Sequence, residues 1–169
     1  MPVVGTDFWY VTAGSIKSRE EMDYELTDAS EARLAEGRRA GSIVNCLMVR
    51  CFKTKCMFGH AIPMRDGQEN AYVVDLITSD VAWLGHVKLV LKSDGEPAIV
   101  ALAKRSLENI KCNLDGMEQV NHEKSHPRDS KSNGGTEVGI RIVRGMLRTH
   151  TMCLEKRLGF SIPPQPHPH

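Results

Sequence analysis

The sequence predicts an α/β domain in which a five-stranded mixed sheet is flanked by helices. Apolar runs rich in β-branched and aromatic residues, typical of strands, occupy residues 3–11, 43–51 and 56–63. Apolar residues at helical spacing follow in residues 68–84, 97–111 and 134–158. Between the first two helical segments lies a short apolar run, 89–91, that ends in Lys-Ser-Asp-Gly-Glu-Pro. Because Gly95 and Pro97 end this strand, we expect Asp94 at its C-terminal tip.

One long polar segment lies between the first two predicted strands. Residues 12–41 carry many interleaved acidic and basic residues and few apolar ones, so we expect a loop insertion between strands one and two. A short polar turn, 53–55, joins the second strand to the third. Cys46, Cys51, Cys56 and His60 could in principle bind zinc, but they lack the paired C-x₂-C spacing, so buried thiols are the preferred interpretation.

The second half of the chain alternates helices with short strands. Pro97 suits the first turn of its helix, and 117–120 is expected to be a short fifth strand. Residues 122–135, rich in Pro, Ser, Asn and Gly, are expected to be a loop. His122 and His126, four residues apart, are metal-ligand candidates but are better explained as solvated loop residues.

The last predicted helix, 134–158, carries both an apolar and a charged row. We expect the apolar row to pack on the sheet; it comprises Val138, Ile142, Met146, Thr149 and Cys153. Glu137, Arg141, Arg144 and Arg148 share a face at i, i+4, i+7 and i+11. These charges fit an ordinary solvated face with Glu137 paired to Arg141, or a surface that meets phosphates. Gly159 is expected to cap the helix, and 160–169 to form a Pro- and His-rich tail or linker.

Composition narrows the class of protein. The chain has 169 residues, a formal net charge of +1 and no strongly basic global field, so attraction to nucleic acid must come from local patches. Five cysteines, an odd number, and no secretory N-terminus favour an intracellular protein that is not secreted. No apolar run approaches the length of a membrane span. The chain begins inside the first predicted strand, which favours a fragment of a longer polyprotein.

Three carboxylates lie at informative places in the predicted elements. Asp7 lies in the first strand, Asp94 ends the fourth, and Glu137 opens the last helix. Carboxylates converging from separate segments are what Mg²⁺ or Mn²⁺ needs, since hard cations take oxygen ligands. Two such ions can activate a water or hydroxyl and stabilise the leaving oxygen of a phosphodiester.

The chain resembles the catalytic core of retrotransposon and retroviral integrases, the DDE polynucleotidyl transferases of the RNase H-like superfamily. Three stretches carry the resemblance: Val4-Gly5-Thr6-Asp7-Phe8, then residues 91–99 around Asp94, then His126–Glu137 with its Asp-Ser-x-Ser-Asn-Gly-x-x-Glu pattern. Arg144–Thr149 continues the third stretch, and the resemblance extends over residues 1–159. The interval between Asp94 and Glu137 is at the longer end of that family's range.

The resemblance implies an RNase H-like fold and a specific chemistry. Asp7, Asp94 and Glu137 would be catalytic and hold Mg²⁺ or Mn²⁺. The reaction would be 3′-end processing and strand transfer of retroelement DNA by a homo-oligomer, in the nucleus or a cytoplasmic pre-integration particle. Candidate DNA contacts are Lys92, Lys131, Asn133, Arg141, Arg144 and Arg148.

Two alternatives remain open. The sequence shows neither the N-terminal zinc-binding domain nor the C-terminal DNA-binding module of that family, so the first alternative is a decayed or domesticated module acting in DNA binding or oligomerisation. An RNase H that cuts RNA in hybrids would use similar metal chemistry, with an additional acidic residue on the first helix. Asp75 and Asp80 are the candidates for that residue, whereas Glu96 is best explained as an exposed cap residue.

Overall fold

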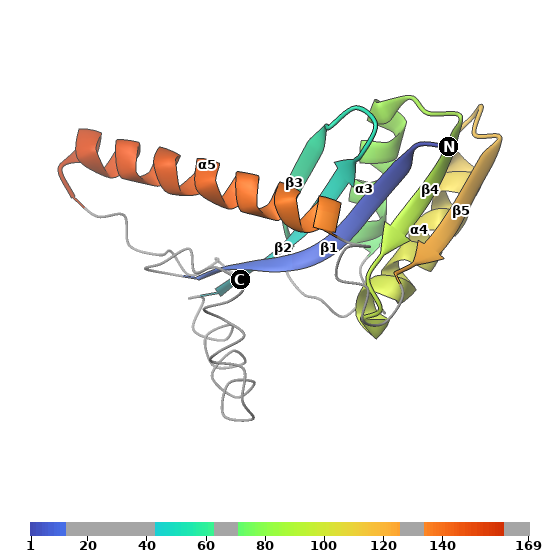
Figure 1. Ribbon diagram of the computed structural model, residues 1–169, viewed down its shortest axis with the longest axis horizontal. Coiled ribbons are helices and arrows are strands. Elements are labelled where there is room, and N and C mark those ends of the chain that lie inside the picture. The colour runs from blue at the N-terminus through green and yellow to red at the C-terminus, as the bar shows by residue number, and fades with distance from the viewer. Residues whose placement is uncertain (13–42, 63–70, 126–133, 161–169) are drawn as a thin grey trace.

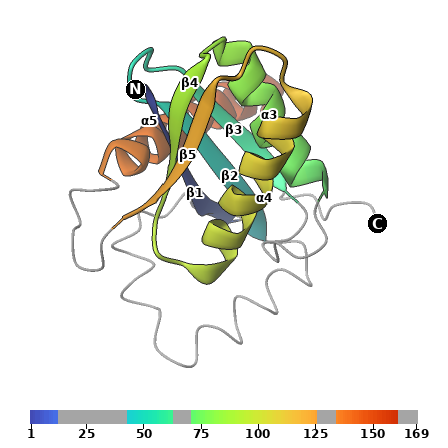
Figure 2. The same cartoon turned by 90° about the vertical axis from the view of Figure 1, so that its right-hand side faces the viewer.

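The computed structural model describes residues 1–12, 43–62, 71–125 and 134–160, which form one mixed sheet with helices on both faces (Figures 1 and 2). The strands are β1 (Val3–Thr12), β2 (Ile43–Cys51), β3 (Met57–Ile62), β4 (Lys88–Ser93) and β5 (Gln119–Lys124). The helices are α3 (Ala71–Leu84), α4 (Pro97–Asn113) and α5 (Gly134–Leu158). This order along the chain is the predicted one.

The sheet has the strand order β3-β2-β1-β4-β5. The β1–β2 and β2–β3 pairs are antiparallel, whereas β1–β4 and β4–β5 are parallel. Parallel neighbours need crossover connections, which α3 and α4 supply. The five-stranded mixed sheet with flanking helices is an RNase H-like arrangement, so the predicted fold class is confirmed. The predicted insertion at 12–41 lies outside the described residues apart from Thr12, which ends β1, and the tail lies outside them beyond Phe160.

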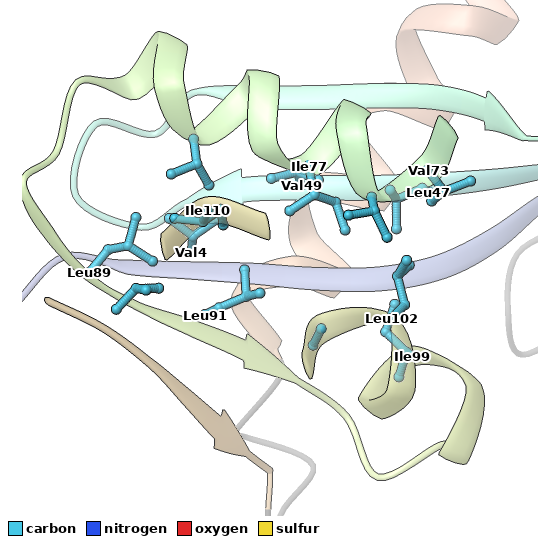
Figure 3. Close-up of a cluster of buried hydrophobic side chains, with 14 of the residues drawn as sticks. Val4, Leu47, Val49, Val73, Ile77, Leu89, Leu91, Ile99, Leu102 and Ile110 are labelled. Carbon is cyan, nitrogen blue, oxygen red and sulfur yellow. The ribbon is translucent and has the colours of Figure 1, made fainter. Parts of the chain in front are cut away.

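The main core lies between the sheet and the α3 and α4 layer (Figure 3). Alternate residues of each strand face this layer, as the period of two in a strand requires. Leu47, Val49, Leu89 and Leu91 are fully buried there. The helices contribute a matching apolar stripe, comprising Val73, Ile77, Ile99, Leu102 and Ile110. Burial of these side chains supplies most of the hydrophobic stabilisation of the domain.

The opposite face of the sheet is covered by the N-terminal half of α5, and here the predicted packing stripe is wrong. Thr136, Gly139 and Ile140 are buried, and Val143 packs with Trp9 in a second, smaller cluster. The residues predicted to pack on the sheet are exposed instead: Val138, Ile142, Met146, Thr149 and Cys153. The helix approaches the sheet so closely that small residues make its contact, which a search for large apolar side chains overlooks.

Two further boundaries bear on the site. Strand β5 is Gln119–Lys124, so the prediction of a strand at 117–120 followed by a loop from residue 122 is wrong in its limits. His122 lies on this strand and is half-buried, not solvated in a loop. The end of α5 is as predicted, since Gly159 has a φ of +74° and its N–H donates to the carbonyl of Glu155 at 2.8 Å.

Candidate metal and nucleic-acid site

Asp7 lies on the face of β1 that α5 covers. Gly5, two residues before it, contacts the first turn of α5, and Trp9, two residues after it, packs with Ile140 of that helix. Because side chains alternate along a strand, Asp7 shares their face. Its side chain is buried, with 5% of the residue exposed. A carboxylate in such a place requires partners, since burying an ionised group without compensation is costly.

Asp94 follows β4 immediately and lies beside Asp7. The parallel register pairs Thr6 with Ser93, so the next residue of each strand forms the next row of the sheet. Neighbouring strands lie about 4.8 Å apart. Leu89 and Leu91 face the α3 and α4 layer, so the alternation places Asp94 on the other face, with Asp7. The sequence predicted both aspartates, and the register of β1 and β4 brings them together.

The Asp94 carboxylate also shapes the turn into α4. Its Oδ1 accepts the backbone N–H of Glu96 at 3.0 Å, the local turn that an aspartate forms with the backbone two residues on. Glu96 is the N-cap of α4 but makes no capping bond with its own side chain. Pro97 occupies the first turn of the helix, as predicted. The end of β4 is therefore held by the Asp94 side chain itself.

Glu137 lies in the first turn of α5, which packs tightly over β1. A Cβ on Gly5 would lie 2.1 Å from Thr136 Oγ1, so Gly5 allows the residue preceding Glu137 to sit directly on β1. A guanidinium N–H of Arg50 donates to the Gly135 carbonyl and ties the same turn to β2. Glu137 is half-buried. It directly follows Thr136, which contacts Gly5, and Gly5 lies two residues before Asp7 on β1. The positive end of the helix dipole favours a carboxylate here.

The carboxylates of Asp7 and Asp94 suit a hard divalent cation, although they do not form a complete ligand set. Aspartates aligned on adjacent strands can supply the carboxylate oxygens that Mg²⁺ and Mn²⁺ prefer. Within residues 1–12, 43–62, 71–125 and 134–160, no group of three or more His, Cys, Asp or Glu side chains is arranged to hold a metal ion. Asp7 and Asp94 are the two predicted carboxylates that the register aligns, and Glu137 lies on α5 as the third predicted carboxylate.

The predicted DNA contacts fall into three structural settings. Lys92 lies two residues before Asp94, on the same face of β4, and pairs with Glu123 of β5 at 3.1 Å. Arg141 and Arg148 are exposed on α5. Arg144 turns inward: its guanidinium carbon lies 5.5 Å from the centre of the Trp9 ring, and it donates to the Tyr10 carbonyl at 3.4 Å. Lys131 and Asn133 lie outside the described residues.

The four residues considered as zinc ligands occupy different settings in the part of the chain that the structure describes. Cys46 and Cys51 are buried, as predicted, whereas Cys56 is half-buried in the turn before β3. Burial raises the pKa of the Cys46 thiol to about 11, although the nearby Arg144 opposes this shift. His60 instead pairs with Asp80 at 2.7 Å.

The additional acidic residue of an RNase H does not reach this edge. Asp75 and Asp80 lie on α3, which covers the face of the sheet opposite to Asp7. Asp80 is buried against His60 of β3, and Asp75 accepts a hydrogen bond from Asn109 of α4 at 3.1 Å. Neither carboxylate joins Asp7 and Asp94.

Sequence reasoning placed His122 in a loop and did not identify Ser125, which directly follows β5. His122 Nε2 lies 2.9 Å from the hydroxyl of Ser93, which is fully buried next to Asp94. Burial lowers the pKa of His122, and the charges of Lys104 and Lys124 lower it further. Ser125 follows β5 as Asp94 follows β4, and its N–H donates to the Ser93 carbonyl at 2.9 Å. The places of His122 and Ser125 in the sheet could be recognised only once the C-terminal end of β5 was known.

The fold defines the chain as an RNase H-like α/β domain, in which the register aligns Asp94, directly after β4, with Asp7 within β1. Neither a scan against protein-family models nor a search of curated proteins finds a match to it. Among the described helices, none combines the length and apolarity that a membrane crossing requires.

Proposed function

We propose that the chain is the catalytic core of a retrotransposon-type integrase, a metal-dependent polynucleotidyl transferase acting on DNA. The observation that carries the proposal is the parallel register of β1 and β4, which ends at Thr6 and Ser93 and so aligns the residues that follow them, Asp7 and Asp94, on the face that α5 covers. An RNase H-like sheet with these two aspartates in line supports the chemistry that the integrase-like motif around Glu137 predicts.

In this proposal the residues of the chain have separate tasks. Asp7 and Asp94 hold Mg²⁺ or Mn²⁺, and Glu137 completes the set from α5. When bound, the cations lower the pKa of an attacking water or hydroxyl and stabilise the leaving oxygen. Lys92, beside the pair, exchanges its Glu123 partner for a DNA phosphate. Lys131, Asn133, Arg141, Arg144 and Arg148 are the further proposed DNA contacts.

The decisive experiment is cleavage of a branched DNA substrate by the disintegration reaction with Mg²⁺ or Mn²⁺. This single-site reaction suits an isolated core. We expect wild-type activity that Asp94→Asn and Glu137→Gln reduce to background. Asp115→Asn and Glu108→Gln, which change exposed carboxylates on the turn after α4 and on α4 itself, are matched controls that keep it. Cation binding is measured by calorimetry on the same proteins.

The outcomes separate the possible failures. A folded wild-type chain that binds the cation but cleaves nothing would indicate a catalytically decayed core. A wild-type chain that binds no cation would overturn the assignment of Asp7, Asp94 and Glu137 as metal ligands.

A second candidate function is that of a non-catalytic module in which the fold serves self-association. The observation that favours it is the C-terminal half of α5, which extends past the sheet (Figure 1). Large apolar side chains are exposed there: Met146, Leu147, Met152, Leu154 and Leu158. Leu147, Leu154 and Leu158 continue the face that packs on the sheet, at spacings of seven and four residues.

Self-association through this helix has its own test. Sedimentation equilibrium should show a dimer that Leu147→Glu with Leu154→Glu converts to monomer without loss of helical circular dichroism. A monomeric wild-type chain at concentrations of tens of micromolar would count against this second function.

A further inference from the structure

Ser125 carries a buried hydroxyl that the fold itself does not use. Only 7% of the residue is exposed, and its Oγ has no hydrogen-bond partner among the residues that the structure describes. A buried hydroxyl without a partner is costly, and native proteins keep few of them. Its backbone, in contrast, is fixed, because the N–H donates to Ser93 at 2.9 Å.

The register places this hydroxyl next to the aspartate pair. Strands β4 and β5 are parallel, with Lys92 opposite Glu123 and Ser93 opposite Lys124, so the next row sets Ser125 beside Asp94. The ion pair between Lys92 and Glu123 shows that these alternate residues share one face. Extended by one residue, the registers of β1, β4 and β5 therefore place Asp7, Asp94 and Ser125 in one row.

Asp94 does not use this neighbour in the present arrangement. Its Oδ1 is bonded to the N–H of Glu96, on the side of the turn into α4. The register makes Ser125 the neighbour of Asp94 on the adjacent strand. A carboxylate rotated away from the turn and toward Asp7 would then have an oxygen free to accept the Ser125 hydroxyl.

We propose that Ser125 is a positioning residue for Asp94, whose carboxylate accepts the Ser125 hydroxyl when it turns toward Asp7 to hold a divalent cation. The hydrogen bond fixes the carboxylate orientation that cation binding requires, as outer partners of metal ligands commonly do. This inference rests on the proposed function, because it assumes the cation site at Asp7 and Asp94.

The test compares Ser125→Ala with Ser125→Thr, which keeps the hydroxyl. Ser106→Ala is the matched control, since Ser106 is also fully buried but its hydroxyl donates to the Leu102 carbonyl at 2.9 Å. Each protein is titrated with Mn²⁺ by calorimetry, and its midpoint of thermal unfolding is measured in EDTA. Loss of an outer partner typically weakens metal binding about 10–100-fold.

We expect Ser125→Ala to weaken Mn²⁺ binding within that range while its midpoint in EDTA equals or exceeds that of wild type. Ser125→Thr should bind Mn²⁺ as wild type does, and Ser106→Ala should bind it normally with a lower midpoint. If Ser125→Ala binds Mn²⁺ as tightly as wild type, the positioning role is refuted while the proposed function stands. If Ser125→Ala instead has a lower unfolding midpoint in EDTA, and Ser125→Thr restores that midpoint but not Mn²⁺ binding, the role of Ser125 is structural. If wild type binds no Mn²⁺, the proposed function fails and this inference fails with it.

Discussion

Replacing Gly5 with alanine should push the first turn of α5 off the sheet. The added Cβ would lie 2.1 Å from Thr136 Oγ1 and 2.9 Å from the Phe52 ring, whereas ordinary van der Waals contact begins at 3.4 Å. The Thr136 hydroxyl belongs to a fully buried side chain, so this hydroxyl or the turn that carries it must move by more than 1 Å. Overpacking of this kind costs about 1–3 kcal/mol.

Part of this cost is offset, because alanine is more favourable than glycine within a strand by about 0.5–1 kcal/mol. We therefore expect a net loss of about 1–2 kcal/mol in the free energy of unfolding. For a domain of this size that corresponds to a fall of about 2–8 °C in the unfolding midpoint. Urea unfolding followed by Trp fluorescence suits the measurement, because Trp9 is buried in the affected contact.

A double-mutant cycle checks the cause of the loss. Thr136→Ala removes the atom at 2.1 Å, so combined with Gly5→Ala it should recover about half of the stability, the Phe52 contact accounting for the rest. Gly145→Ala is the control, since nothing lies within 4 Å of its Cβ position, and it should stabilise α5 by about 1 kcal/mol. The reasoning is refuted if Gly5→Ala unfolds within about 0.5 kcal/mol of wild type, or if Thr136→Ala recovers nothing.

Three further predictions follow from the site. Because burial and nearby lysines lower the pKa of His122, the unfolded chain binds its proton more readily. Stability should therefore fall as the pH drops from about 6.5 toward the lowered pKa, and His122→Gln should flatten this slope in thermal melts. Cys46, with a pKa of about 11, should resist iodoacetamide at pH 8 while the exposed Cys112 reacts, as mass spectrometry of the native protein would show. Arg144→Gln should cost about 1–2 kcal/mol in urea unfolding, because its guanidinium lies over Trp9 in a half-buried contact; no effect on stability would leave Arg144 as a DNA contact only.

The fold was predictable because its core strands are apolar runs with clear ends. Strands at 43–51 and helices ending at 84 and 158 emerge at the expected limits, since turn residues follow each of them. The face of α5 was not predictable from its apolar residues. Val138 and Ile142 form a regular stripe but face solvent, because the helix packs through Thr136 and Gly139. Close approach favours small residues, and periodicity analysis gives them no weight.

Only part of the site was predictable from the sequence. Asp7 and Asp94 could be chosen because each belongs to a strand with an apolar signature, but only the register shows that they are neighbours. Strand β5 lies at the edge of the sheet and buries few of its side chains, so its polar residues after Val120 resemble a loop in sequence. Ending that strand early also hides Ser125. Once β5 extends to Lys124, the parallel strands β4 and β5 end at the same level beside the middle of β1, and the carboxyl ends of parallel strands are where open α/β sheets bind ligands. The weakest strand signal in the chain therefore decides whether the aspartate pair has a third neighbour.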